Sequence, residues 1–561
     1  MTPKIKRQTF FEDNHIHSTY SDGQHSLGEL LEYNHFHDQL DLTMTDHVNK
    51  ETDWFFQYIE EIKRYRKQYP HFAIRIGCEV KILEDGTLNT RKDILDAAEV
   101  IVGSVHHFSN IKSLGKEELL EKEYTLTKVL ARHPDIDVLG HPFSMGQRFH
   151  KHTPPIEYVE TVYRLCVENG IRFELSPKFA SEPIRELAAR EIAKGNRNNF
   201  SFGSDVHKSC GEIGDAAHAF AEPITVFVTG GGAGVGQSIL KSLKLSKVRT
   251  RVIVGDSSPL AVGLYRAQAS HIIPRADNPT YLTALEKICR AEQVDLLLIG
   301  TDVELNVFAQ NKAAFEKATG ACVIVSDPET VAISDDKWET VGFLKSHGFP
   351  HVRSALVDSA DAFIRDVEFP IVVKPRIGAR SVGFRVVPNE VVLRSALQKD
   401  ATLILQEYLQ KEDEEYTCGA FFYEGSCYGV AVMKRWLRNG DTYKAIALRD
   451  PEMERFVEAV GKKLRIVGPC NFQLRKSGDD FKIFEINCRF SGTTGAASAL
   501  GFNVVNALLQ KLFFNRPLRP LAVRESYIFR YWNEVFAAPE EVETLTERGR
   551  LEEAHSDTNL F

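Results

Sequence analysis

The sequence has no long hydrophobic run, no cluster of basic residues and no closely spaced pair of cysteines. A membrane-crossing helix needs about 20 consecutive apolar residues, so the sequence predicts no transmembrane segment. The nine cysteines are scattered without Cys-x-x-Cys pairing, which favours reduced cytosolic thiols over a disulfide framework. The opening Met-Thr-Pro-Lys-Ile-Lys-Arg leads directly into polar residues, and we therefore expect no signal peptide and a cytoplasmic protein.

The net charge of -8, without a basic stretch, argues against binding to nucleic acid or to an anionic membrane. A chain of 561 residues is too long for one core, and we expect several structural units. Histidine is unevenly distributed, because 15 of the 19 histidines precede Pro223. We place boundaries after residues 222, 330 and 525, which leaves a C-terminal extension at 526–561. The end of this extension, from residue 540, is charged, and we expect it to be loosely held.

In the histidine-rich part, metal-binding side chains follow one strand-like segment after another. The first segment ends in His15-Ile16-His17, and the next ends in Thr45-Asp46-His47. Helix-length amphipathic segments, such as 54–69 and 183–194, lie between several of these segments. Strands that alternate with helices form a parallel sheet or barrel, and side chains at their carboxyl ends meet at one mouth. A single such histidine is usually a satisfied core residue, but six repeated placements favour a metal site.

The order HxH, TDH, GxE, SVH, GHP and SDxH resembles the PHP family of metal-dependent phosphoesterases over residues 10–210. The resemblance implies a distorted (β/α)7 barrel with two or three divalent metals such as Zn²⁺, Mn²⁺ or Fe²⁺. It also implies a water nucleophile whose pKa is lowered by the clustered cations. The ligands implied by the motifs are His15, His17, Asp22, His47, Glu79, His106, His141, Asp205 and His207. Arg148 and Lys178 are candidate phosphate anchors, although either residue could be a solvated surface charge.

Residues 223–330 predict a Rossmann-like βαβ beginning. The strand 224–228 is followed by a glycine-rich stretch at 229–237 and then by a helical pattern. The glycines give Gly-x-Gly-x-Gly rather than the usual dinucleotide fingerprint, so this motif is a weak indication of a dinucleotide site. The glycine turn could equally shape a substrate pocket or permit close packing.

The stretch from Cys470 to Gly492 predicts a β-hairpin around Lys-Ser-Gly-Asp-Asp. With a three-residue loop at 478–480, Gln473 lies opposite Glu485, and the period of two places Asn471 and Asn487 on the same face. Oxygen ligands of this kind suit Mg²⁺. The alternative is an amphipathic hairpin with a solvated polar face.

The segment 331–525 contains further motifs besides the hairpin. Lys337 follows acidic residues at a predicted helix start, Lys374 ends the strand 370–375, and residues 378–383 form a glycine-containing loop. Together with the hairpin, these pieces resemble the ATP-grasp superfamily, and most closely its carbamoyl-phosphate-synthetase-like branch, over 224–525. The resemblance implies an α+β ATP-grasp domain that follows a Rossmann-like pre-ATP-grasp unit. Cys488 departs from the family pattern, which usually has proline there.

The resemblance implies that Lys337 and Lys374 hold the ATP phosphates and that Arg489 stabilises the transferred phosphoryl group. The other residues expected to contact nucleotide are Ser381, Gln406, Glu407, Tyr408, Leu409 and Glu415. The Mg²⁺ ligands implied are Gln473, Glu485 and Asn487.

These features predict a bifunctional enzyme. One half would be an ADP-forming ligase that joins a small-molecule carboxylate to an amine or ammonia through an acyl phosphate. The other half would hydrolyse a phosphorylated small molecule. The alternative is a PHP phosphodiesterase or nuclease whose ATP-grasp half senses nucleotide or acts like a kinase. The sequence leaves open whether the chain forms a homo-oligomer.

Overall fold

The computed structural model describes residues 11–37, 39–109, 111–378, 382–398, 400, 402–409, 414–478, 480–531 and 533–554. The chain divides into two compact units. The first extends to Glu222 and also includes Lys247–Arg249, and the second begins at Pro223. Within the described residues, no helix combines the length and the hydrophobicity needed to cross a membrane.

The first unit is a parallel β-barrel that is nearly closed. Its strands, in sheet order, are β1 (Glu12–Ile16), β2 (Asp41–Met44), β4 (Ile74–Lys81), β5 (Val100–Ser104), β6 (Val138–Leu139), β7 (Arg172–Leu175) and β8 (Phe200–Phe202). The short strand β3 (His47–Val48) pairs with β4 off this path. A parallel bridge between Ile16 and Val206 joins the two edges of the sheet. The predicted seven-stranded barrel is therefore confirmed.

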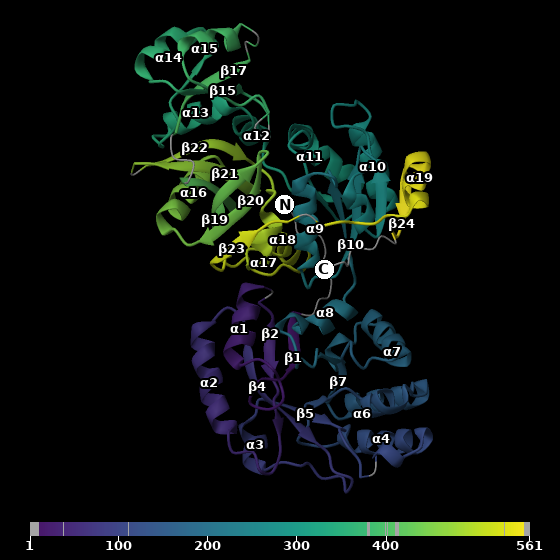
Figure 1. Ribbon diagram of the computed structural model, residues 1–561. Coiled ribbons are helices and arrows are strands. Elements are labelled where there is room, and N and C mark those ends of the chain that lie inside the picture. The colour runs from purple at the N-terminus through teal and green to yellow at the C-terminus, as the bar shows by residue number, and fades with distance from the viewer. Residues whose placement is uncertain are drawn as a thin grey trace. The chain divides into compact units, whose positions relative to one another are not determined.

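Helices lie around the outside of the barrel (Figure 1). They are α1 (Leu27–Phe36), α2 (Phe55–Gln68), α3 (Lys92–Ala97), α4 (Lys116–Leu130), α5 (Ser144–His150), α6 (Ile156–Glu168), α7 (Glu182–Ala193) and α8 (Asp215–Phe220). Helix α2 shows why the sequence forms this layer, because Phe55, Tyr58, Ile59 and Ile62 recur at helical spacing and are all buried. The helices predicted at 54–69 and 183–194 are confirmed as α2 and α7.

The second unit begins with a Rossmann-like sheet. Its order is β13 (Cys322–Val323), β12 (Leu296–Leu298), β9 (Ile224–Thr229), β10 (Thr250–Asp256), β11 (Ala269–Ile272) and β24 (Arg550–Glu552). The accompanying helices are α9 (Gly234–Lys244), α10 (Tyr281–Ala291) and α11 (Leu305–Thr319). The glycine-rich stretch forms the turn between β9 and α9, where Gly230 has φ +61° and a Cβ would lie 2.4 Å from Thr301.

The C-terminal segment returns to this sheet. Helix α19 (Pro539–Arg548) buries Leu545 completely, and β24 pairs antiparallel with β11. Figure 1 draws α19 and β24 in yellow. The sequence suggested a loosely held, charged tail from residue 540. That expectation is wrong for residues 540–552, because Leu545 of the helix and Leu551 of the strand are both buried and the strand pairs with a sheet edge.

Two antiparallel sheets complete the second unit. The smaller has the order β14 (Ser354–Leu356), β17 (Leu403–Glu407), β15 (Ile371–Pro375) and β16 (Arg385–Val387). The larger has the order β22 (Asp480–Asn487), β21 (Gly468–Ser477), β18 (Glu415–Tyr423), β19 (Ser426–Arg438), β20 (Asp441–Leu448) and β23 (Ser526–Phe529). The helices are α12 (Pro328–Asp335), α13 (Lys337–Ser346), α14 (Ala360–Asp366), α15 (Glu390–Leu397), α16 (Pro451–Lys463), α17 (Thr494–Ala499) and α18 (Val504–Phe514).

The hairpin β21–β22 has the predicted facing pairs, but its turn is shorter than predicted and its register contains a bulge. Gln473 lies opposite Glu485 and Asn471 opposite Asn487, as expected. Ser477, however, pairs with Asp480, so the predicted three-residue loop is wrong. A bulge between Gln473 and Leu474 shifts the register by one residue and compensates for the shorter turn.

Candidate metal centre and nucleotide pocket

The mouth of the barrel gathers all nine residues that the motifs singled out. They fall into four overlapping groups whose ligand atoms lie within 4.8 Å of one another. The groups are His15, His17 and Asp205; His15, Glu79 and His141; His47, Glu79 and His106; and His17, Asp22, His47 and His207. Because neighbouring groups share residues, the arrangement suits several adjacent metal ions rather than one.

These side chains lie in or after the strands of the parallel barrel, and they meet at one mouth, as predicted. His15 lies in β1, His47 begins β3, and Glu79 lies within β4 rather than at its end. The remaining ligands lie in loops that follow strands. Two of them, His141 and Asp205, have positive φ angles of 22° and 54°, which directs their side chains back to the mouth.

Glu79 is the central carboxylate of the cluster. Its Oε1 lies 2.6 Å from Nε2 of His106 and 3.0 Å from Nε2 of His141, and its Oε2 lies 3.0 Å from Nδ1 of His47. Burial raises the pKa of Glu79, but the surrounding histidines outweigh that effect and hold it well below its usual value. The carboxylate is thus ionised, as a metal ligand must be.

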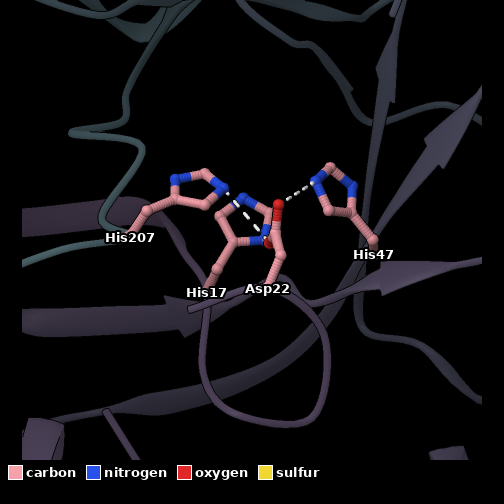
Figure 2. A group of neighbouring side chains, drawn as sticks. All are labelled: His17, Asp22, His47 and His207. Carbon is pink, nitrogen blue, oxygen red and sulfur yellow. Dashed lines mark ion pairs between the residues drawn. The ribbon is translucent and has the colours of Figure 1, made fainter. Parts of the chain in front are cut away.

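The outer side of the cluster surrounds Asp22. Figure 2 shows His207 and His47 on either side of this residue, with ion-pair distances of 3.2 and 3.5 Å to its carboxylate. His17 lies beside them, and burial lowers its pKa to about 3. At neutral pH its imidazole is therefore neutral and has a lone pair for a cation.

Buried atoms without hydrogen-bond partners provide the test of whether metal ions fit. Among the residues that the structure describes, Nε2 of His15, both ring nitrogens of His17 and Oε2 of Glu79 are buried and have no partner with hydrogen-bond geometry, although ion-pair neighbours lie close to them. Unsatisfied buried polar atoms are rare in proteins. Here they belong to groups whose ligand atoms lie within 4.8 Å of one another. Imidazole nitrogens and carboxylate oxygens are the donor set preferred by Zn²⁺, Mn²⁺ and Fe²⁺.

Cationic side chains line the cavity above the cluster, which has a volume of about 520 Å³. Arg148 lies over the ring of Phe179 at 4.7 Å. Lys178 donates to Oε2 of Glu212 at 2.8 Å and to the carbonyl of Asp205, so it reaches the cavity already paired. Lys208, which the sequence analysis did not single out, also lines the cavity.

In the second unit, a cavity of about 480 Å³ is lined by residues of both antiparallel sheets. It contains nine of the predicted nucleotide and Mg²⁺ contacts: Lys337, Lys374, Gln406, Glu407, Tyr408, Leu409, Glu415, Gln473 and Glu485. Ser381 lies outside the described residues. The volume is typical of small-molecule sites.

Lys374 is the most perturbed group in this cavity. Burial lowers its pKa to about 8, the carboxylates of Glu485 and Glu415 oppose that shift, and Lys337 adds to it. Lys337 donates to the carbonyls of Arg376 and Gly378, at 3.3 and 2.9 Å. Two ammonium groups facing an acidic pair fit a polyphosphate bound with Mg²⁺.

The acidic residues of the cavity are paired by arginines and a lysine that the sequence analysis did not assign. Arg435 donates to Oε1 of Glu415 at 2.7 Å and to Oε1 of Gln473 at 2.8 Å, while Arg475 donates to Oε2 of Glu415 at 2.5 Å. Lys482 donates to Glu407 at 2.7 Å. Arg475 and Lys482 lie 60 and 75 positions from their partners, so spacing gave no signal for these two.

Asn487 and Arg489 do not line the large cavity. Asn487 donates to Oε1 of Glu485 at 2.9 Å, which places it behind that carboxylate. Arg489 donates from Nε and Nη2 to the carboxylate of Asp302 at 2.6 and 3.0 Å. Its fork is thus occupied by an acid from the Rossmann-like sheet, and its action on a phosphoryl group stays a prediction.

Three family models match separate parts of the chain. Residues 13–178 match the PHP domain, residues 226–324 match the PylC-like N-terminal domain, and residues 399–535 match the ATP-grasp of a biosynthetic pathway with the Ter operon. The PHP match is shorter than the expected span of 10–210, although Asp205 and His207 join the same cluster.

Curated relatives are similar to parts of the chain. DNA polymerase/3'-5' exonuclease PolX of Bacillus subtilis is 29% identical over 137 residues, which cover 23% of this chain and 23% of PolX. The arginine-specific carbamoyl phosphate synthase large chain of Neurospora crassa is 25% identical over 287 residues, which cover 47% of this chain and 24% of that protein. The chain thus spans about a quarter of the length of these relatives.

Among solved structures, the ADP complex of purK, an N5-carboxyaminoimidazole ribonucleotide synthetase, is 16% identical with a TM-score of 0.45. It covers 54% of this chain and 80% of that one, a similarity too low to inform function. The motifs, the barrel and the family models lead to one conclusion. The chain joins a PHP domain to a PylC-like N-terminal domain and an ATP-grasp domain, and it is homologous to the large chain of carbamoyl phosphate synthase.

Proposed function

We propose that the second unit is an ADP-forming ligase that joins a carboxylate to an amine or ammonia through an acyl phosphate. The first unit would hydrolyse the phosphate ester of a small molecule. The single observation that carries the ligase is the cavity that the buried Lys374 lines together with Glu485, Gln473 and the residues of β17 that would contact nucleotide. An ATP-grasp domain and homology to carbamoyl phosphate synthase support this chemistry.

In the proposed ligase reaction, the substrate carboxylate attacks the γ-phosphorus of ATP, ADP leaves, and the amine then displaces phosphate from the acyl phosphate. Lys337 and Lys374 would hold the polyphosphate in line with the acceptor, and Arg435 would keep Gln473 and Glu415 in place. Bound Mg²⁺ would be held by Gln473, Glu485 and Asn487 and would neutralise charge on the phosphate oxygens. Because Lys337 is held by two backbone carbonyls and Lys374 is buried before substrate binds, little reorganisation is needed during transfer.

In the proposed phosphatase reaction, water attacks the phosphorus and the alcohol leaves. Bound divalent metals would be held by the nine clustered residues and would lower the pKa of the attacking water. Arg148 and Lys208 would bind the phosphoryl oxygens from the opposite wall of the cavity. Lys178 would orient the loop that carries Asp205, since it donates to that residue's carbonyl.

A second candidate for the first unit is a phosphodiesterase or nuclease. The similarity of 137 residues to PolX favours it, because that relative is described as a 3'-5' exonuclease. The net charge of -8 weighs against a long polyanionic substrate.

The experiment that tests the proposal uses the full chain and measures ADP and phosphate release across panels of carboxylic acids, amines and phosphomonoesters, and nucleotide release from single-stranded DNA. ADP formation should require an acid and an amine and should vanish in Glu485→Ala. Metal-dependent monoester hydrolysis should vanish in His17→Ala. Each variant is the control for the other, since each changes one unit. ADP release that ignores both co-substrates would refute the ligase, and cleavage of DNA alone would favour the nuclease.

A further inference from the structure

Glu174 is a buried carboxylate directly behind the metal-ligand cluster, and none of the motifs includes it. It lies in β7, and its side chain is fully buried. Its two oxygens have one partner each: Oε1 lies 2.7 Å from Nδ1 of His15, and Oε2 lies 2.5 Å from the backbone nitrogen of His141. A single side chain therefore contacts two of the clustered ligands.

The contact with His15 determines which ring nitrogen is available to a cation. A carboxylate accepts hydrogen bonds, so in this contact Nδ1 of His15 carries a proton. In the neutral ring, which is the form that can bind a cation, the lone pair is on Nε2; this atom is buried, has no hydrogen-bond partner among the described residues, and lies 3.3 Å from Glu79 and 3.8 Å from Asp205. His15 belongs to two of the four ligand groups, so its tautomer affects both.

The contact with His141 fixes a backbone conformation that the chain would otherwise resist. His141 has φ +22°, outside the favoured regions for an L-residue. The hydrogen bond from its backbone N–H to Glu174 restrains this conformation and keeps Nε2 of His141 3.0 Å from Glu79.

The packing around Glu174 leaves no room for a larger neighbour. A Cβ on Gly203, the residue after β8, would lie 2.1 Å from Oε1 of Glu174 and 2.6 Å from Cβ of His15. The glycine before Ser204-Asp205 is therefore required so that the carboxylate can reach the ring.

We propose that Glu174 is a positioning residue that holds His15 in its Nδ1–H tautomer and His141 in its strained backbone conformation. It thereby sets the affinity of the two metal positions that share His15. The inference rests on the proposed metal site. It predicts that removing the charge of Glu174 weakens metal binding although no ligand is lost.

The test measures binding of Co²⁺ alone to the chelator-treated full chain, by titration calorimetry and by the visible absorption spectrum of the bound ion. In Glu174→Gln, the amide NH₂ would donate to Nδ1 and move the ring proton to Nε2. We expect Co²⁺ affinity to fall about 10- to 100-fold, with an altered spectrum. Glu174→Asp, which keeps the charge but shortens the side chain, should give a smaller loss and serves if the Gln variant fails to fold.

The matched control is Glu123→Gln. Glu123 is also buried in this unit, but it accepts only backbone N–H groups, from Met145 and Gly146 at 2.8 and 2.9 Å. Its variant should bind Co²⁺ as the parent protein does. Unchanged affinity and spectrum in folded Glu174→Gln would overturn the inference. Absence of Co²⁺ binding by the parent protein would instead refute the metal site itself.

Discussion

Nucleotide binding should draw a proton onto Lys374, by an amount that depends on pH. Burial lowers the pKa of this lysine to about 8 in the empty cavity. A polyphosphate beside the ammonium should return the pKa to roughly 10.4, the ordinary value for lysine. The uptake per nucleotide bound is then about 0.1 proton at pH 7, about 0.5 at pH 8 and about 0.9 at pH 9.

Titration calorimetry with a non-hydrolysable ATP analogue, in buffers of different ionisation enthalpy, measures this uptake directly. Lys374→Arg is the informative variant, because a guanidinium stays protonated at every pH used and should abolish the uptake while keeping the charge. Lys444→Met, at an exposed lysine over the ring of Tyr443, is the control and should leave the uptake unchanged. A pH-independent uptake, or the same uptake in Lys374→Arg, would refute the assignment.

The same pKa has a consequence for the ligand-free protein. The pKa of Lys374 is lower in the folded state than its unfolded value of 10.5, so the unfolded chain binds more protons between pH 8 and pH 10.5. The contribution of this group to the free energy of unfolding should therefore rise with pH across that window. Comparing the pH dependence of urea unfolding with that of Lys374→Met isolates the contribution.

Three further predictions concern other parts of the chain. Adding Mn²⁺ to chelator-treated protein should raise the unfolding temperature of the first unit, with about 2.7 kcal/mol of stabilisation at a metal concentration 100 times the dissociation constant; calorimetry that shows no shift would contradict the metal site. Arg435→Met should destabilise the second unit by roughly 3 kcal/mol, because it leaves Glu415 buried with one fewer cationic partner. A loss of unfolding free energy below about 1 kcal/mol in urea would show that the Arg435–Glu415 ion pair does not stabilise this unit. Gly461→Ala should destabilise the protein although Gly461 lies in a helix, because the new Cβ would lie 2.1 Å from the ring of Phe422. Gly342→Ala in α13 is the matched change: its Cβ would meet nothing within 4 Å among the described residues, and it should stabilise the protein by up to about 1 kcal/mol. Thermal melts that rank the two variants the other way would refute this difference in packing.

The candidate metal ligands could be found from the sequence because they follow a local rule. Each of His15, His47 and His141 lies in or next to a strand of a parallel barrel, and such strand ends share one mouth. Local order along the chain therefore predicts proximity in space. The hairpin pair Gln473 and Glu485 was found in the same way, since antiparallel pairing is set by local register, although the turn and the bulge were not foreseen.

Contacts between distant strands gave no such signal. Arg475 reaches Glu415 across 60 positions of sequence, and Arg489 reaches Asp302 in the Rossmann-like part of the unit. Neither arginine differs by its neighbours in sequence from a solvated surface residue. Their partners depend on which strands lie side by side and on how far each side chain extends.

The sequence by itself determined the α/β class, the barrel, the order of its candidate metal ligands and the facing pairs of the hairpin. Hydrophobic period and strand-end placement act over a few residues, and a single chain carries that information. Only the tertiary structure decided that Glu174 stands behind His15, that Arg489 is bound by Asp302, and that the C-terminal strand pairs with β11. Those contacts join residues that are 159, 187 and nearly 280 positions apart, and burial selects such partners only after the chain has folded.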